Sequence, residues 1–290
     1  MVKMRVIIAD IKGMKKDFKD RRLMRARLIN ALKSKADATQ GPVRSFLETA
    51  RAKKIKQFWI INGIAATVPA ERVEQIAGFP GVETVTLDAV ILAPEPVYEA
   101  EALSEWNLEK VKVTDLWNYG ITGQETVVAN MDTGVDYLHP DLSDRWREGN
   151  NSWHNFFSNP ANSFLCKTPG KCSACELSSL YPCGSNGHGT GTMGVMAGGD
   201  ESGTAIGTAP GTKWIAVKIL NDKGVGSTSS AIEGFQWLLE LGESAPDVIN
   251  NSWGFAPGQC FSNLQSIIHT LREADIAVVF SAGNSGPYGL

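Results

Sequence analysis

Residues 1–93 combine short apolar runs with a long, highly charged stretch of helical spacing. Within that stretch, apolar residues such as Phe18, Leu23 and Leu32 recur at close to the period of an α-helix. Gly41-Pro42 indicates a helix break, and Asn62-Gly63 indicates a hairpin turn. The pattern predicts strands at residues 4–9, 57–61, 64–68 and 82–87, and helices at residues 15–35, 43–52 and 69–77. The order β-α-β-β-α-β is that of a ferredoxin-like α+β domain.

Residues 106–290 follow a different pattern, in which apolar runs alternate with helix-like segments. The run Thr126 to Met131 shows little polar alternation, which predicts a strand buried on both faces. The pattern predicts strands at residues 126–131, 213–220, 248–250 and 276–280, and helices at residues 229–241 and 262–273. Such alternation indicates an α/β domain with a doubly wound parallel sheet, whose functional groups gather at the carboxyl ends of the strands.

Between these two regions, residues 93–101 are acidic and proline-marked, as expected of an extended linker. A length of 290 residues also favours about two domains. We therefore expect one domain at residues 1–93, a linker at 94–105 and a second domain at 106–290.

The formal net charge of −3 conceals an asymmetry between the two domains. Residues 1–93 contain 18 Lys and Arg against 9 Asp and Glu, which gives +9, and the remaining residues contain 10 against 22, which gives −12. A basic segment often binds nucleic acid. The alternative, which we favour, is that the basic domain docks on the acidic part of the same chain.

The apolar runs of the sequence are all shorter than the ~20 residues of a membrane span. The apolar run at the N-terminus is also too short for a signal peptide. Either the protein is intracellular or its true start lies upstream of Met1.

A single histidine, His188, lies among glycines in the stretch 186–198, which then becomes small and apolar. An imidazole that titrates near neutral pH is a common general base, although a lone histidine is more often only a satisfied polar residue. Residues 189–194 also match the dinucleotide fingerprint G-x-G-x-x-G. We reject a nucleotide site because residues 181–186 read as a loop and not as the strand that this fingerprint requires.

Two further polar residues directly follow predicted strands. Asp132 comes after residues 126–131, where a carboxylate can accept a hydrogen bond from an imidazole, and its alternative role is to cap a turn. Asn284 follows residues 276–280, and its side-chain amide can donate to an oxyanion or simply form a turn.

Taken together and in this order, four motifs resemble those of the subtilisin-like serine proteases, and residues 116–142 resemble the bacillopeptidase F-like branch. The motifs are Asp132-Thr133-Gly134, Gly187-His188-Gly189-Thr190, Asn250-Asn251-Ser252-Trp253-Gly254 and Ser281-Ala282-Gly283-Asn284. The resemblance runs from about Trp106 to the end of the chain. Residues 1–93 resemble, less specifically, the inhibitory propeptide of the same family.

The resemblance implies a role for each matched position. Asp132 would orient and stabilise the imidazolium, His188 would act as general base, and Asn284 would donate to the oxyanion. Two further segments would pair with an extended substrate backbone, namely Gly224, Val225 and Gly226 on one side and Ser252, Trp253 and Gly254 on the other. Asp141 matches a position that binds structural calcium in many relatives, although the loop 199–208, from which the other ligands would come, is short. The chemistry itself implies no cofactor.

The chain departs from the family pattern in three respects. No serine between residues 1 and 290 has the Gly-Thr-Ser-Met-Ala context of the family's nucleophile, and Gly191 stands where the family usually has a second histidine. Cys166, Cys172, Cys175 and Cys183 lie close together ahead of His188, either as two disulfides, which we favour, or as a zinc site. Cys260 is the odd one and is expected to be a free buried thiol.

The sequence therefore predicts the N-terminal part of a subtilisin-like serine endopeptidase precursor, truncated before its nucleophilic serine and inactive as it stands. Its expected partners are protein or peptide substrates and its own propeptide, with no nucleic acid and no membrane span. The expected location is outside the cell. The alternative is a pseudo-protease that binds peptides without cleaving them.

Overall fold

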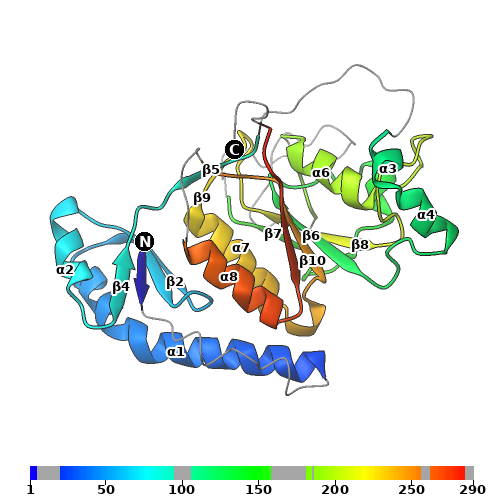
Figure 1. Ribbon diagram of the computed structural model, residues 1–290. Coiled ribbons are helices and arrows are strands. Elements are labelled where there is room, and N and C mark those ends of the chain that lie inside the picture. The colour runs from blue at the N-terminus through cyan, green and yellow to red at the C-terminus, as the bar shows by residue number, and fades with distance from the viewer. Residues whose placement is uncertain (5–19, 95–105, 158–180, 185, 256–261, 285–290) are drawn as a thin grey trace. The chain divides into compact units, whose positions relative to one another are not determined.

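The computed structural model describes residues 1–4, 20–94, 106–157, 181–184, 186–255 and 262–284 (Figure 1). It divides into two compact units. Unit 1 joins residues 1–89 with residues 227–245 and 258–276, and unit 2 comprises residues 90–226, 246–257 and 277–290. The division at residues 1–93 and 106–290 made from the sequence stays a prediction.

Unit 1 contains a four-stranded antiparallel sheet of strand order β2-β3-β1-β4. The elements follow one another as β1 (Val2–Met4), α1 (Arg21–Thr49), β2 (Lys53–Phe58), β3 (Gly63–Thr67), the 3₁₀ turn η3 (Ala70–Arg72), α2 (Val73–Ala77) and β4 (Val82–Val85). A small core of Val43, Leu47, Ile64 and Ile76 holds the helices on this sheet. Residues 5–9 and 15–19 of the predicted first strand and helix lie outside the described residues.

Helix α1 corrects the helix break predicted at Gly41-Pro42, because it continues through both residues. Asp20 caps its start by accepting hydrogen bonds from the backbone N–H groups of Arg22 and Leu23 at 2.9 and 3.4 Å. An interior proline removes one backbone hydrogen bond. The buried stripe of α1 runs past Pro42 without interruption, at Leu28, Leu32, Ala36, Val43 and Leu47. The free energy gained by burying this stripe outweighs the loss of one backbone hydrogen bond at Pro42. The local sequence Gly41-Pro42 does not reveal this burial.

The predicted hairpin is present, but its turn is longer than Asn62-Gly63 alone. Strand β2 ends at Phe58, and the N–H of Asn62 donates to the carbonyl of Trp59 at 3.2 Å. Asn62 has a φ of 48°, which asparagine tolerates better than most residues. Trp59, Ile60 and Ile61 therefore belong to the turn, although the apolar run predicted that they continue the strand.

Unit 1 also contains three segments from late in the chain, α7 (Thr228–Glu240), η4 (Gly242–Ser244) and α8 (Ser262–Glu273). Polar contacts connect them to the N-terminal part. Gln236 accepts hydrogen bonds from the backbone N–H groups of Trp59 and Ile60 at 2.8 and 3.3 Å, and Lys56 pairs with Glu233 at 2.6 Å. The buried Arg25 donates to the carbonyls of Ala274 and Gly242 at 2.8 and 3.0 Å. The N-terminal elements and these helices thus form one packed body.

Unit 2 is built on a five-stranded, wholly parallel sheet of order β11-β10-β6-β8-β7. The strands are β6 (Val127–Asp132), β7 (Trp153–Asn155), β8 (Lys213–Lys218), β10 (Val248–Asn251) and β11 (Ala277–Phe280). Strands β6 and β8 are buried along nearly their whole length, in agreement with the apolar runs of the sequence.

In the described part of unit 2, the helices are α3 (Trp106–Val111), α4 (Val113–Asn118), α5 (Pro140–Ser143) and α6 (His188–Ala197). Helix α6 packs on β6 (Figure 1). Met193 and Ala197 of α6 join a core that includes Val128, Trp146 and Trp214. None of the helices in the described part of the chain is long and apolar enough to cross a membrane.

Three short strands of the described residues were not predicted from the sequence, namely β5 (Val90–Leu92), β7 and β9 (Val225–Ser227). Of these, β5 and β9 pair with each other. The N–H of Ala93 donates to the carbonyl of Gly224 at 2.8 Å, and Ile91 lies against Gly226. Leu92 also exchanges two backbone hydrogen bonds with Gly254, each 3.0 Å long. The segment Val90–Ala93 is therefore held by backbone pairing on both of its edges.

Candidate active site

Asp132 and His188, which are 56 residues apart, meet at the carboxyl end of β6. Asp132 is the last residue of β6, and His188 is the first residue of α6. The Nδ1 atom of His188 lies 2.8 Å from Oδ1 and 3.0 Å from Oδ2 of Asp132. The Asp132 side chain is fully buried and that of His188 is 10% exposed. With Nδ1 turned to the carboxylate, Nε2 is the nitrogen that can take a proton from a reacting hydroxyl.

Neighbouring threonines fix the carboxylate and the start of the helix. The N–H of Thr133 donates to Asp132 Oδ1 at 2.6 Å, and Thr192 Oγ1 donates to Oδ2 at 3.3 Å. Thr133 Oγ1 in turn accepts a hydrogen bond from the N–H of Gly189 at 3.0 Å. The backbone approach is so close that a Cβ atom at Gly189 would overlap the carbonyl oxygen of Gly134. The glycine after His188 is thus required by packing.

The hydrogen bond that His188 Nδ1 donates to Asp132 raises the pKa of His188, although partial burial of the imidazole opposes this shift. The carboxylate therefore favours the imidazolium, which is the form that a general base takes after it has accepted a proton. The tautomer with the proton on Nδ1 follows from the same contact.

The two segments predicted to bind a substrate backbone flank the segment Val90–Ala93. Gly224 and Gly226 lie along one of its edges, and Gly254 lies along the other. Trp253 is buried and packs against Phe280 with ring centroids 5.3 Å apart, and Ser252 Oγ accepts a hydrogen bond from Asn250 at 3.0 Å. Of residues 252–254, Gly254 therefore makes the backbone pairing. Substrate binding at these positions stays a prediction.

Asn284 lies in an exposed bend after β11, and its role at an oxyanion stays a prediction. Asp141 is buried at the start of α5 and accepts hydrogen bonds from the N–H of Ser202, at 2.9 Å, and from its hydroxyl. Burial raises the pKa of Asp141, but the hydrogen bonds from Ser202, together with His139 and Glu201, lower the pKa overall. The described residues include no group of three His, Cys, Asp or Glu that could hold a metal ion. The calcium site at Asp141 stays a prediction.

Cys183 is disulfide-bonded, which agrees with the disulfide interpretation of this cysteine. Its carbonyl lies against Gly134, in the turn that follows Asp132. Cys166, Cys172, Cys175 and Cys260 lie outside the described residues.

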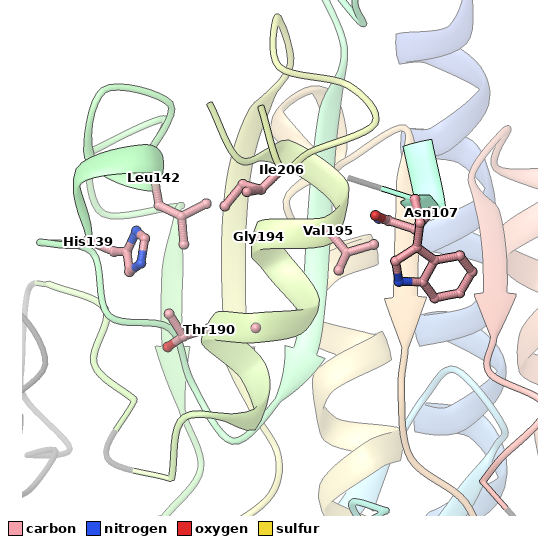
Figure 2. A pocket seen from close by; sticks show the side chains of 9 residues that line it. Asn107, His139, Leu142, Thr190, Gly194, Val195 and Ile206 are labelled. Carbon is pink, nitrogen blue, oxygen red and sulfur yellow. The ribbon is translucent and has the colours of Figure 1, made fainter. Parts of the chain in front are cut away.

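A pocket of about 490 Å³ opens on the face of α6 that carries Gly191 (Figure 2). Figure 2 shows Thr190, Gly194 and Val195 on this helix, with His139, Leu142 and Ile206 on one side and Asn107 on the other. A side chain at Gly191 would project into open space, since a Cβ atom there meets nothing within 4 Å. The glycine at position 191 therefore leaves a space next to helix α6.

Sequence reasoning assigned no role to Thr133, Thr192 or Lys218. Thr133 and Thr192 bond the Asp132 carboxylate, and Lys218 bonds the carbonyl of Thr133. Lys218 is the last residue of β8, and its side chain is only 2% exposed. Its ammonium group donates to the carbonyl of Thr133 and, at 2.8 Å, to Asp222. A lysine at the end of an apolar run predicts a strand end that is exposed to solvent. The contribution of Lys218 to the site is therefore visible only from its burial in the structure.

Comparison with known proteins shows what this arrangement is similar to. Residues 123–289 match the model of the subtilase family of peptidases. The chain is 33% identical over 285 residues to bacillopeptidase F of Bacillus subtilis, covering 90% of this chain and 19% of that protein. It is 30% identical over 234 residues to subtilisin E of the same species, covering 81% of this chain and 52% of that protein. The chain thus spans 52% of the length of subtilisin E and 19% of the length of bacillopeptidase F.

The structure is similar to that of fervidolysin from Fervidobacterium pennivorans, a keratinolytic enzyme related to subtilisin. The TM-score is 0.61 at 20% sequence identity, and the match covers 84% of this chain and 38% of fervidolysin. At this identity the likeness shows a shared fold of parallel sheet and helices.

Proposed function

Because the chain belongs to the subtilase family, we propose that the protein that carries it is a serine endopeptidase, made as a precursor. The observation that supports this most directly is the Asp132–His188 pair, with Nδ1 of the histidine 2.8 Å from a wholly buried carboxylate. Asp132 orients the ring, and His188 takes the proton of the attacking hydroxyl and returns it to the leaving amine. Asn284 donates to the oxyanion.

The nucleophilic serine of this proposal belongs to a part of the protein outside this chain, because no serine of residues 1–290 has the required sequence context. The substrates are proteins or peptides bound as an added strand between Gly224–Gly226 and Gly254. The protein acts outside the cell, where the disulfide of Cys183 is stable.

A fluorophosphonate probe, which labels activated serines, tests the proposal. The full-length protein should be labelled, its His188→Ala variant should not, and the 290-residue chain should also remain unlabelled. Labelling of the short chain at a serine, abolished by His188→Ala, would show that the nucleophile lies within residues 1–290. If the full-length protein is folded but is not labelled, the protein is better described as a pseudo-protease that binds peptides without cleaving them.

The N-terminal, ferredoxin-like domain acts in this proposal as an intramolecular inhibitor. The pairing of Val90–Ala93 with Gly224 and Gly254 is that of a bound peptide strand, and it supports this role. Processing then falls within residues 93–105. Residues 1–93, added to the processed enzyme, should inhibit it, and more weakly at high salt because part of the attraction is between exposed charges.

The Leu92→Pro variant of this fragment removes an N–H that donates to Gly254 and should lose most of the inhibition. Leu92→Ala keeps the backbone bond and serves as the matched control. A fragment that binds DNA tightly and leaves the protease unaffected would contradict an inhibitory role.

A further inference from the structure

Lys218 is a buried cation beside the Asp132–His188 pair, and the proton transfer proposed for that pair gives Lys218 no role. It lies directly next to Asp132 in the parallel register of β6 and β8. Burying a lysine is costly unless its charge is paired and its N–H groups are bonded. Here the ammonium donates to the carbonyl of Thr133 and to Asp222 at 2.8 Å.

The contacts of Lys218 reach the turn that carries Asp132. Thr133, whose carbonyl accepts from Lys218, also donates its N–H to Asp132 Oδ1 and accepts from the N–H of Gly189. One residue therefore connects the ammonium, the carboxylate and the first turn of α6. Movement of Lys218 would displace all three.

A second line of contacts leads from Lys218 to the other side of His188. The carbonyl of Asp222 accepts a hydrogen bond from Asn186 Nδ2 at 3.1 Å, and Asn186 Oδ1 accepts one from the N–H of His188 at 3.2 Å. Asp222 also belongs to the turn 221–225, which Asn221 closes by bonding to the backbone of Val225. That turn presents Gly224 and Gly226, which pair with Val90–Ala93.

We propose that Lys218 is a positioning residue that holds the Asp132 turn, the His188 loop and the edge Gly224–Gly226 in one register. Its positive charge also interacts electrostatically with the Asp132 carboxylate. In the proposed protease, on which this role rests, the same residue sets both the geometry of the proton-accepting pair and the proton affinity of His188.

The charged groups of the described residues around His188 determine the sign of this effect. Asp132 on β6 and Asp222 after β8 are negative, Lys218 is positive, and Asp136 lies in the turn that contacts Thr190 of α6. A positive charge that partly neutralises Asp132 weakens the attraction of the carboxylate for the imidazolium. Removing that charge therefore raises the pKa of His188, and removing Asp222 lowers it.

The test is an NMR titration of the histidine ring protons, which needs no protease activity. The chain has four histidines, and a His188→Gln variant assigns the signal of His188. In Lys218→Met the pKa of His188 should rise by about half a unit or more, and in Asp222→Asn it should fall. Lys218→Arg keeps the charge and should leave the pKa near that of the wild type.

Lys213→Met is the matched control, because Lys213 starts the same strand and its exposed side chain bonds the carbonyl of Asp144. It lies about 16 Å along the strand from Lys218, beyond the Debye length at physiological salt, so it should leave the pKa of His188 unchanged. If Lys218→Met does not fold, the pKa of His188 in Asp222→Asn, compared with that in Lys218→Arg and in the wild type, decides whether the proposal holds. An unchanged pKa of His188 in folded Lys218→Met, or in Asp222→Asn, overturns the proposal.

In the active full-length enzyme, the acid limb of kcat/KM should move to higher pH in Lys218→Met by the same amount as the titration. A full-length protein with no activity but with the expected titration shifts would contradict the proposed function and leave the role of Lys218 intact.

Discussion

At the scale of single residues, the decisive contact is the one between Asp132 and the Nδ1 atom of His188. The carboxylate is fully buried, and the backbone of Thr133 holds it on one side. Replacing Asp132 by asparagine keeps the shape but removes the charge that raises the pKa of His188. We expect that pKa to fall in Asp132→Asn, measured by NMR titration. In the proposed full-length protease, activity should drop about 10⁴-fold, a magnitude known from subtilisin and trypsin themselves.

The same contact makes stability depend on pH. Since the folded pKa of His188 is raised, the imidazolium–carboxylate pair stabilises the fold fully below the unfolded pKa of about 6.5, and its contribution is lost as the pH rises through the folded pKa. Urea denaturation of the wild type should therefore show a free energy of unfolding that decreases as the pH rises above about 6.5. The free energy of unfolding of His188→Gln should lack this decrease with pH. An equal dependence on pH in both proteins would refute the contribution of the Asp132–His188 pair.

At the scale of elements, helix α6 contains two glycines with opposite requirements. A Cβ atom at Gly191 meets nothing within 4 Å, whereas one at Gly189 would overlap the carbonyl oxygen of Gly134. Gly191→Ala should stabilise the protein by about 0.5–1 kcal/mol, because alanine loses less backbone entropy in a helix. Gly189→Ala should destabilise it, and thermal unfolding of the two variants compares them directly. Destabilisation by Gly191→Ala would show that the space beside α6 is filled by another group.

The parallel sheet could be predicted because β6, β8, β10 and β11 are apolar runs that carry their own signal. Asp132 and His188 could be singled out because each lies within a recognisable motif. Lys218 could not, because its contacts are with Thr133 and Asp222, which lie outside its own strand. Helix α1 and strand β5 show the same limit. Pro42 is tolerated because of distant packing, and Val90–Leu92 becomes a strand only through residues more than 130 positions away.

At the scale of the whole molecule, unit 1 combines the N-terminal residues 1–89 with segments from late in the chain, and the buried Arg25 connects the two. Arg25→Met should destabilise the protein by about 2–4 kcal/mol, because the carbonyls of Ala274 and Gly242 lose a charged donor. Arg22→Ala is the matched control on the same helix. Its ion pair with Glu243 is exposed, so its loss should cost less than about 0.5 kcal/mol. Urea denaturation measures both, and equal costs would contradict the role of Arg25.

Removing residues 1–105 takes away most of unit 1 and leaves α7, η4 and α8 without the N-terminal elements of that unit. The surfaces of these helices that contact the N-terminal elements then become exposed. Since net stability is only about 5–15 kcal/mol, residues 106–290 alone should bind a hydrophobic dye and show no cooperative thermal transition. A sharp, reversible transition of this fragment without dye binding would contradict this expectation.

If the protein is the protease precursor proposed above, the pairing of Val90–Ala93 with Gly224 and Gly254 has a consequence for how its inhibition responds to dilution. While the segment remains part of the chain, it competes with free peptides at an effective concentration on the order of millimolar, however dilute the protein is. One cut after Ala93 replaces this fixed local concentration with an ordinary bimolecular equilibrium. At protein concentrations below the dissociation constant of the freed domain, that domain would diffuse away, so spreading of the proposed protease into a large volume would be part of its activation.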